Sequence, residues 1–572
     1  MADGAGAECG RAGGAGARVL AVIALLFLLL PATPGVRAAT DPAFSAEAIR
    51  AHVTFLADDR LEGRDTGSAG HAAAARYVAR QFEAIGLKPA GDRGGWYQQA
   101  PFQRTSHGPT PGTVTMTGPA GETGWTHGAD VLIAPNAREA HIALSAPVVF
   151  VGYGIDDARL GLDDYAGLDV RGKIVVALRG YPAGLPDEEG AYLAGAKART
   201  AQTHGAIGLF SIDTIRSMKA RPWARLVQAA AVPRFSWIGD DGRPFDESPG
   251  IRVAGSLNSR AAAALFAGAP RSIAAIRRDA AKPGGRPRGF ALNTRMAVRF
   301  DSVSQRVTSP NVVGVVPGND PALKGQHVVL VAHLDHIGVT PAAADDSAGP
   351  ATVGDRINNG ALDNAAGVAT MLEVARAMAR SADGPRRSIL FLASTGEEKG
   401  LLGAKYFVHH APVPIDRIIG AVSIDMPLLL YPFTDVIAFG ADHSTLGPIV
   451  AGAVAPMGVT VMPDPMPQET IFLRSDHYMF ARKGVPAMFL ATGYANGGKD
   501  AWRQFLGGAY HRPGDDLSQP IDWAAGARFA EVNYRVARAL ADGGTPPRWY
   551  RRNFFSDMFA PHAARAPDPG QR

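Results

Sequence analysis

The stretch VVLVAHLDHIGV, residues 328–339, decides how the sequence is interpreted. Its aliphatic run is typical of a strand that is buried on both faces of a sheet. The run ends abruptly in three polar side chains, those of His333, Asp335 and His336. In sheets of parallel strands, functional groups collect at the carboxyl ends of the strands. The stretch therefore indicates a functional site, provided that other segments bring partners to the same edge.

Strands and helices alternate along the chain from about Phe290 onward. The segments NVVGVVPG, HVVLVAHLDHIG, SILFLAST, AVSIDM and VPAMFLA have the pattern of strands. The segments ALDNAAGVATMLEVARAMAR, GLLGAKYFVHH and WAAGARFAEVNYRVARALA have the pattern of helices. Continuous aliphatic strands that alternate with helices indicate an α/β fold, in which a mostly parallel mixed sheet is sandwiched by helices.

The first residues have the pattern of a secretory signal peptide. Arg18 precedes the apolar run VLAVIALLFLLL, and Pro31 ends it. A small residue at Ala38 suits a cleavage site. The run is shorter than the about 20 residues that span a bilayer, so we expect no stable membrane span after cleavage. Cys9, the only cysteine, lies in this segment, which leaves the mature protein without a thiol. These features predict a bacterial periplasmic or secreted protein.

The composition divides the chain into segments. Between the two parts of the main domain, short β-rich runs such as APVVFVGYGI and GKIVVALRG indicate an insert. The expected segments are a signal peptide at 1–38, the N-terminal part of the main domain at 39–118, an insert at 119–265, the catalytic part at 266–545 and a loosely ordered tail at 546–572. The net charge of +5 is concentrated near the two ends of the chain. Because the body contains no cluster of Lys and Arg interleaved with aromatic residues, we expect no nucleic-acid partner.

Further polar clusters lie at the ends of other predicted strands or in nearby loops. They are Asp363 in GALDNAAG, Glu397 and Glu398 in STGEEKGLLG, Asp425 at the end of AVSIDM, and Tyr510 and His511 in AYHRPGDD. Two His, a bridging carboxylate and two terminal carboxylates, without a thiol, suit a pair of Zn²⁺ ions. Adjacent residues at a strand end point in different directions. One glutamate of the pair can therefore bind metal while the other acts as a base.

The same residues carry a resemblance to a known family. In this order, NVVGVVPG, AHLDHIG, GALDNAAGVA, STGEEKGLLG, SIDM, RSDHYMFARKGVPA and YHRPGDD resemble metallopeptidase family 28, which includes bacterial leucyl aminopeptidases and glutamate carboxypeptidase. LEGRDTGSAG resembles the family's N-terminal segment. VVFVGYGI and DDYAGLDVRGKIVVALRG resemble the protease-associated (PA) insert of many members. The resemblance covers nearly all of the mature chain and implies the zinc-exopeptidase fold, with a β-rich PA domain inserted.

The resemblance also implies a role for each residue. His333 and Asp425 would bind one metal, Glu398 and His511 the other, and Asp363 would bridge the two. Glu397 matches the general base, which activates a water that bridges the metals. Asp335 matches an acid that orients His333, and Tyr510 matches a tyrosine that donates to the oxyanion. Asp476 and His477 of RSDHY are expected to support the site without binding metal.

The function expected from this pattern is that of an exported zinc exopeptidase that removes N-terminal residues from peptides. Three alternatives stay open: a carboxypeptidase on the same metals, a glutaminyl-cyclase-like acyltransferase and a catalytically inactive, receptor-like relative. A carboxypeptidase needs a cationic pocket for the substrate carboxylate. The loops near the predicted site carry both signs of charge, so charge alone does not choose an end of the peptide.

Overall fold

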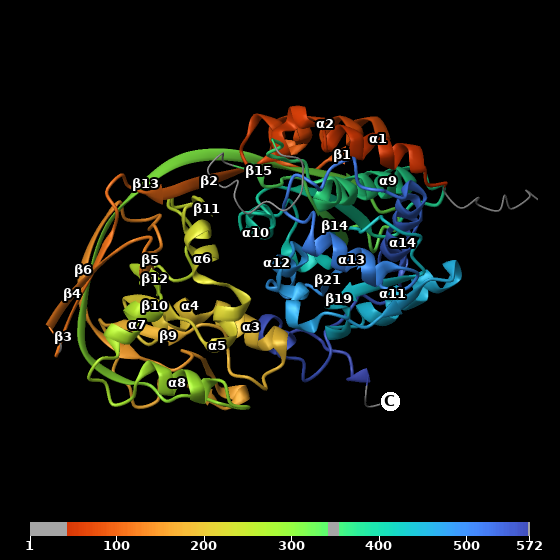
Figure 1. The fold of residues 1–572 in the computed structure, drawn as a ribbon. Coiled ribbons are helices and arrows are strands. Elements are labelled where there is room, and N and C mark those ends of the chain that lie inside the picture. The colour runs from red at the N-terminus through yellow and green to blue at the C-terminus, as the bar shows by residue number, and fades with distance from the viewer. Residues whose placement is uncertain (1–42, 120, 341–353, 570–572) are drawn as a thin grey trace, which may run out of the picture. The chain divides into compact units, whose positions relative to one another are not determined.

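The aliphatic run that ends in His333 forms strand β14 (His327–His333) in the middle of a mixed sheet (Figure 1). In the computed structural model, β14 lies parallel to β17 (Ser388–Ser394) on one side and to β18 (Ile418–Ile424) on the other. β21 (Ala487–Thr492) continues the parallel run beyond β18. Every residue of β17 and β21 is buried, as expected for strands covered on both faces. The predicted, mostly parallel sheet is confirmed.

The described residues are 43–119, 121–340 and 354–569. The predicted signal peptide at 1–38 lies outside them, and so do Asp345 and Asp346 of the charged loops. Within the described ranges, no helix has the length and apolar content that are needed to cross a membrane.

Antiparallel strands extend the central sheet at both edges. The last residues of β13 (Phe290–Val316) pair with β17, and β1 (Lys88–Pro89) pairs with the same part of β13. At the other edge, β19 (Asp435–Phe439) lies antiparallel to β21, and β20 (Thr460–Met462) lies parallel to β19. The sheet is therefore parallel at its centre and mixed at its margins.

Helices cover both faces of this sheet (Figure 1). Side chains alternate between the faces along each strand. Val328 and Leu330 of β14 pack in the hydrophobic cluster of the first helical layer, and Val329 and Val331 pack in that of the second. The first layer contains α1 (Ala46–Leu56), α2 (Ala69–Ile85), α9 (Ala366–Arg380), α11 (Leu446–Val454) and α14 (Trp523–Asp542). The second contains α10 (Leu402–His409) and α12 (His477–Ala481).

A second sheet forms the core of the insert. Strands β9 (Ile174–Leu178), β10 (Gly208–Ile212) and β12 (Val253–Leu257) are parallel to one another, and β6 (His141–Phe150) is parallel to β9. The remaining strands of this sheet are β3 (Thr113–Gly118), β4 (Gly121–Thr126), β5 (Val131–Ile133) and the first part of β13. Its helices are α3 (Asp187–Gly195), α4 (Lys197–Thr203), α5 (Ile215–Ala220), α6 (Trp223–Ala230), α7 (Ser259–Leu265) and α8 (Ile273–Ala280).

The insert is wider than the expected range 119–265. Strand β3 lies before residue 119, and residues 290–301 of β13 pair with β3 and β6. The following residues of β13 pair with β2 (Tyr97–His107), which also pairs with β11 (Arg234–Trp237). Because one unbroken strand serves both sheets, no change of composition marks the boundary.

The expected loosely ordered tail is also different in the structure. Trp549 is 2% exposed, and its indole Nε1 donates to the carbonyl of Gly484 at 2.8 Å. α15 (Phe554–Phe559) follows, and the ring of Phe555 lies 5.0 Å from that of Phe472. Burial of these aromatic side chains stabilises the segment against the body of the protein.

Candidate metal centre

The parallel strands bring the predicted ligands to one edge of the central sheet. His333 is the last residue of β14, Asp425 follows β18 directly, and Glu397 and Glu398 follow β17 after a two-residue turn. Asp363 lies in a short helical turn, Ala361–Ala365, that leads into α9. His511 follows α13 (Gly498–Gly507). The structure therefore brings together all five side chains that the resemblance implied as ligands.

A first group of donors consists of His333, Asp363 and Asp425. The Nε2 atom of His333 lies 3.2 Å from Oδ1 of Asp363 and 3.1 Å from Oδ1 of Asp425. All three residues are buried. Burial lowers the pKa of His333, but the surrounding carboxylates, Asp425 first, outweigh it and raise this pKa well above its usual value.

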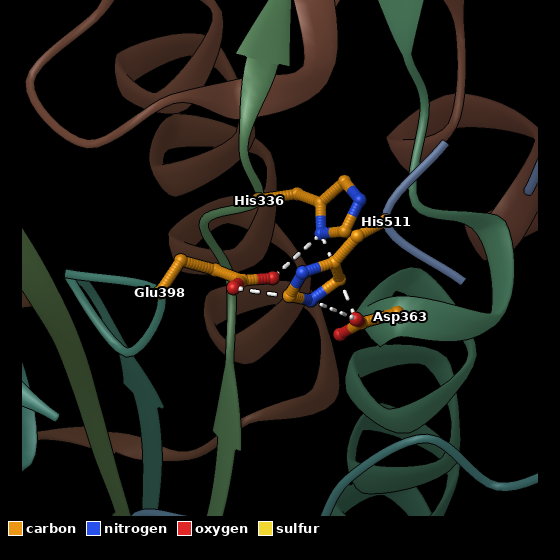
Figure 2. A group of neighbouring side chains, drawn as sticks. All are labelled: His336, Asp363, Glu398 and His511. Carbon is orange, nitrogen blue, oxygen red and sulfur yellow. Dashed lines mark hydrogen bonds and ion pairs between the residues drawn. The ribbon is translucent and has the colours of Figure 1, made fainter. Parts of the chain in front are cut away.

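A second group consists of His336, Asp363, Glu398 and His511 (Figure 2). The Nε2 atom of His511 lies 3.1 Å from Oδ2 of Asp363 and 3.3 Å from Oε2 of Glu398. Asp363 thus turns one carboxylate oxygen to each group, which is the arrangement of a bridging ligand. Burial lowers the pKa of His511, but its hydrogen bonds to Asp363 and Glu398 outweigh this and raise the pKa to about 10.

His336 is the member of the second group for which the sequence predicted no role. Its ring is fully buried, and its Nδ1 lies 2.8 Å from Oε1 of Glu398 and 3.9 Å from Oδ2 of Asp363. Figure 2 shows this side of the ring turned toward the two carboxylates. The available signal was its place in the polar cluster that ends β14. The sequence does not show how the backbone turns after Asp335, and this turn decides where the ring points.

Asp335 contacts His333 in a different way from the one expected. The Nδ1 atom of His333 lies 3.0 Å from the backbone carbonyl oxygen of Asp335, not beside its carboxylate. The carboxylate accepts hydrogen bonds from the hydroxyl of Thr66 at 2.9 Å and from the amide of Glu397 at 3.1 Å. Asp335 therefore fixes His333 through its backbone and the loop of Glu397 through its side chain.

Glu397 and Tyr510 border the two groups. Burial, with the nearby carboxylates of Asp425 and Glu398, raises the pKa of Glu397 well above its usual value. Burial also raises the pKa of Tyr510, and the carboxylates of Asp363 and Glu398 raise it further. The ring of Tyr510 lies 3.9 Å from that of His511. Tyr510 is therefore held as a neutral hydroxyl, which is able to donate a hydrogen bond.

Arg64, in the glycine-rich turn LEGRDTGSAG, holds two ligand loops together. Its side chain is 1% exposed. The guanidinium donates to the carbonyls of Leu334 at 2.9 Å, Asn359 at 2.6 Å and Gly360 at 3.0 Å, and also to that of Leu56. Leu334 lies in the loop of His333, and the next two lie in the loop of Asp363. A buried cation thus links both loops without taking a carboxylate away from the centre.

Asp515 supports the loop of Asp363 from the opposite end of the chain. Its carboxylate accepts hydrogen bonds from the amides of Leu362 at 2.8 Å and Asp363 at 3.0 Å. Its backbone carbonyl accepts from the amide of Ala361 at 3.0 Å. Burial raises the pKa of Asp515 to about 6. The motif YHRPGDD therefore supplies both His511 and a clamp on the shared ligand.

Asp476 and His477 belong to neither donor group. The hydroxyl of Ser394, the last residue of β17, donates to Asp476. Burial raises the pKa of Asp476 to about 7. His477 is fully buried, and burial lowers its pKa to about 3. In the structure these residues belong to the packing behind the strand ends.

A cavity of about 280 Å³ opens beside Asp425 and Tyr510. Most of its wall is apolar: Met426, Phe439, Met466, Ile471, Phe489, Trp502 and Leu506. Its charged wall residues besides Asp425 are Glu469 and Arg474, which form an ion pair at 3.1 Å. The cavity is therefore suited to an apolar group placed next to the first donor group.

The donors fit zinc. Imidazole nitrogen and carboxylate oxygen are the ligands that Zn²⁺ takes in sites without thiolates. Within each group, the candidate ligand atoms lie within 4.8 Å of one another, and the two groups share Asp363. Carboxylates packed this closely repel one another unless cations lie between them. The arrangement therefore suits two neighbouring metal ions.

Comparisons with known proteins find a similarity to a family of peptidases. Residues 311–537 match the model of peptidase family M28. The chain is 28% identical to leupeptin-inactivating enzyme 1 of Streptomyces exfoliatus over 258 residues, 43% of this chain and 51% of the relative. It is 35% identical to the alkaline phosphatase isozyme conversion protein of Escherichia coli over 99 residues, 17% of this chain and 26% of that protein. The chain thus spans about half the length of the first relative and less of the second.

Among solved structures, the chain is similar to an aminopeptidase from Aneurinibacillus sp. strain AM-1, with a TM-score of 0.49 and 20% identity over 87% of this chain and 94% of the other. It is also similar to a zinc aminopeptidase from Bacillus subtilis, with a TM-score of 0.41 and 17% identity over 88% and 96% of the two chains. The family match includes the strand ends that carry His333, Glu397, Glu398 and Asp425, together with Asp363 and His511. Over residues 311–537, the chain is thus similar to peptidase family M28.

Proposed function

We propose that the protein is an exported dinuclear zinc aminopeptidase of the bacterial periplasm or secreted fraction, which removes apolar residues from the N-termini of peptides. One observation carries this proposal: two groups of imidazole and carboxylate donors share the buried Asp363, with Glu397 beside them. His333 and Asp425 would hold one zinc ion, and Glu398 and His511 the other. When bound, such a pair polarises the scissile carbonyl and lowers the pKa of water.

The remaining steps belong to side chains of this chain. Glu397, held by Asp335 at its amide, accepts a proton from the attacking water and returns it to the leaving amine. Its raised pKa favours the uptake of that proton. The neutral hydroxyl of Tyr510 donates a hydrogen bond to the oxyanion as the carbonyl becomes tetrahedral. Glu397 thus transfers the proton, and Tyr510 stabilises the oxyanion.

The apolar cavity favours attack at the N-terminus over attack at the C-terminus. A carboxypeptidase needs a free cation beside the site to bind the substrate's terminal carboxylate. Arg474, the cation in the cavity wall, is already paired with Glu469. An aminopeptidase needs acceptors for the substrate ammonium, and the carboxylates of the centre can supply them. The cavity then takes the side chain of the first residue.

We also propose that the insert is a PA-like domain that controls access to the centre and takes no part in the chemistry. Every proposed ligand lies outside it. Glu247 of the insert forms ion pairs with two residues of the central domain, Lys405 at 2.9 Å and Arg482 at 2.8 Å. His443, near β19, contacts Glu188 of the insert at 2.9 Å. These contacts hold the insert beside the wall that contains Phe439 and Met466.

The decisive experiment compares aminoacyl substrates that have a free amine with the same substrates after acetylation. The purified mature protein is assayed for both, and its zinc content is measured. We expect two zinc ions per chain, rapid release of leucine or phenylalanine, and almost no cleavage after acetylation. Rapid cleavage of an acetylated peptide from its C-terminal end would favour the carboxypeptidase. A protein active with a single ion would point to the acyltransferase, and a zinc-loaded but inert protein to the receptor-like relative.

A further inference from the structure

The two donor groups of the candidate metal centre are unequal. The first has three residues, His333, Asp363 and Asp425, whereas the second has four, because His336 joins Asp363, Glu398 and His511. We infer that His336 is a fourth protein ligand of the second zinc position, so that this position is closed while the first is open. The inference rests on the proposed dinuclear centre and says how its two positions differ.

The distances in the second group fit four ligands around one ion. Four tetrahedral ligands at about 2.0–2.1 Å from zinc lie about 3.3 Å from one another. His511 lies 3.1 Å from Asp363 and 3.3 Å from Glu398. The Nδ1 atom of His336 lies 2.8 Å from one of these carboxylates and 3.9 Å from the other. The separations of His336 therefore fall on either side of the value for a shared ion.

The direction of the ring supports a ligand role over a simple hydrogen bond. A ring that only orients Glu398 needs to approach that carboxylate alone. His336 instead turns Nδ1 toward the same two residues that His511 approaches with Nε2 (Figure 2). Its other nitrogen, Nε2, is buried and has no hydrogen-bond partner among the described residues. The only polar contacts of this ring in the described chain thus lie on the side of the carboxylates.

The backbone holds the ring in this place. The amide of His336 donates to the carbonyl of Arg64 at 3.3 Å, and Arg64 in turn binds the loops of Leu334 and Gly360. The ring is 0% exposed, so it has no alternative orientation in solvent. A side chain fixed in this way is preorganised for binding, since few of its conformations are lost when the ion binds.

An open and a closed position have different chemistry. Structural zinc sites are closed by four protein ligands, whereas catalytic sites keep one place for water or substrate. The first position has three protein donors, and its ligand Asp425 lines the apolar cavity. We therefore assign substrate binding and exchangeable zinc to the first position. The second position holds its ion tightly and mainly supplies positive charge.

Zinc release from the full-length mature protein tests the inference. The protein is loaded with two equivalents of zinc and mixed with an excess of a chelator. We expect the wild type to release one ion at least about 10-fold faster than the other. In His336→Gln, which keeps an N–H donor for Glu398 but has no imidazole, the slow release should accelerate by about 10- to 100-fold. His327→Gln, at the other end of β14, is the matched control and should release zinc like the wild type.

X-ray absorption at the zinc edge gives a second measurement, which does not depend on whether the variant folds. The loaded wild type should show about 1.5 imidazoles per zinc if His333, His336 and His511 all bind, and about 1.0 if His336 does not. A value near 1.0, equal release of both ions, or retention of the slow ion in His336→Gln would overturn the inference alone. Two zinc ions with about 1.5 imidazoles in a protein that cleaves no substrate would support the inference and reject the proposed function.

Discussion

Among the described residues, parallel strands end side by side in the insert sheet and in the central sheet, and the two places differ in charge balance. In the insert, Arg179 follows β9 and Asp213 follows β10, next to a cavity of about 540 Å³. Arg179 is satisfied there, because it donates to Asp213 at 2.7 Å and to Ser256 at 2.8 Å. In the central sheet, the carboxylates of Asp363, Asp425, Glu397 and Glu398 crowd around imidazoles.

This difference shows that the order of the strands decides where a site can form, whereas the side chains at the strand ends decide what the site can bind. The larger cavity lies beside the neutral pair, and the smaller one lies beside the crowded carboxylates. Carboxylates in a small, buried volume are costly unless cations compensate them. The excess of negative charge, more than the size of a cavity, marks the edge of the central sheet as the candidate metal site.

Removal of zinc should produce the largest difference between the edge of the central sheet and the edge of the insert sheet. A chelator should abolish hydrolysis, and added zinc should restore it, because the centre needs its cations. Hydrogen exchange should increase in residues 333–336 and 360–365 and stay unchanged in residues 174–179 of the insert. Full activity in the metal-free protein would show that the edge of the central sheet does not need cations.

Substitutions of the adjacent Glu397 and Glu398 should have different effects at the edge of the central sheet. Glu397→Gln should lower kcat by about 100-fold or more, since it removes the general base, and should leave the zinc content near that of the wild type. Glu398→Gln should instead lose zinc from the second position. Zinc analysis and kinetics on both variants test this assignment, and equal zinc loss in the two would show that it is wrong.

Arg64→Met should destabilise the two ligand loops at the edge of the central sheet without removing a ligand. It leaves buried carbonyls without their donor and should lower the free energy of unfolding by about 3 kcal/mol. It should also weaken zinc binding by about 10-fold, because it loosens two ligand loops. Arg60→Met is the control, as Arg60 is 82% exposed and pairs only with the nearby Asp58 among the described residues. Chemical denaturation and zinc titration measure both effects. Equal results for the two variants would show that Arg64 does not support the ligand loops.

The smallest effect on catalysis is expected from a substitution at the edge of the insert sheet. Arg179→Gln breaks the pair with Asp213 but lies outside the proposed chemistry. Its kcat on a minimal aminoacyl substrate should stay within about twofold of the wild type, because distant sites act independently. KM for longer peptides is the parameter that can change. A collapse of kcat in a folded variant would show that the insert edge takes part in the reaction.

Much of the central domain could be predicted from the sequence, because an aliphatic run with a polar end is typical of a buried strand that carries a site. The alternation around β14 predicted the sheet, and the ordered motifs pointed to five side chains that the structure brings together. His336 and Arg64 were missed because their roles depend on backbone turns. Glu62 and Arg64 have positive φ values of 46° and 51° in a turn that no periodicity describes. The insert boundaries were missed because β13 crosses them with one unbroken β pattern.

The shared strand β13 also has a consequence for the order of folding. Every partner of its first part in the insert sheet precedes it in the chain. Its last part pairs with β1, which also precedes it, and with β17, which begins only at Ser388. As the chain is synthesised from its N-terminus, the insert sheet can be completed before the central sheet has its middle strands. The edge of β13 that pairs with β17 is then unpaired, and unpaired strand edges promote association between chains. A truncation before residue 388 should therefore give a folded insert that aggregates through this strand.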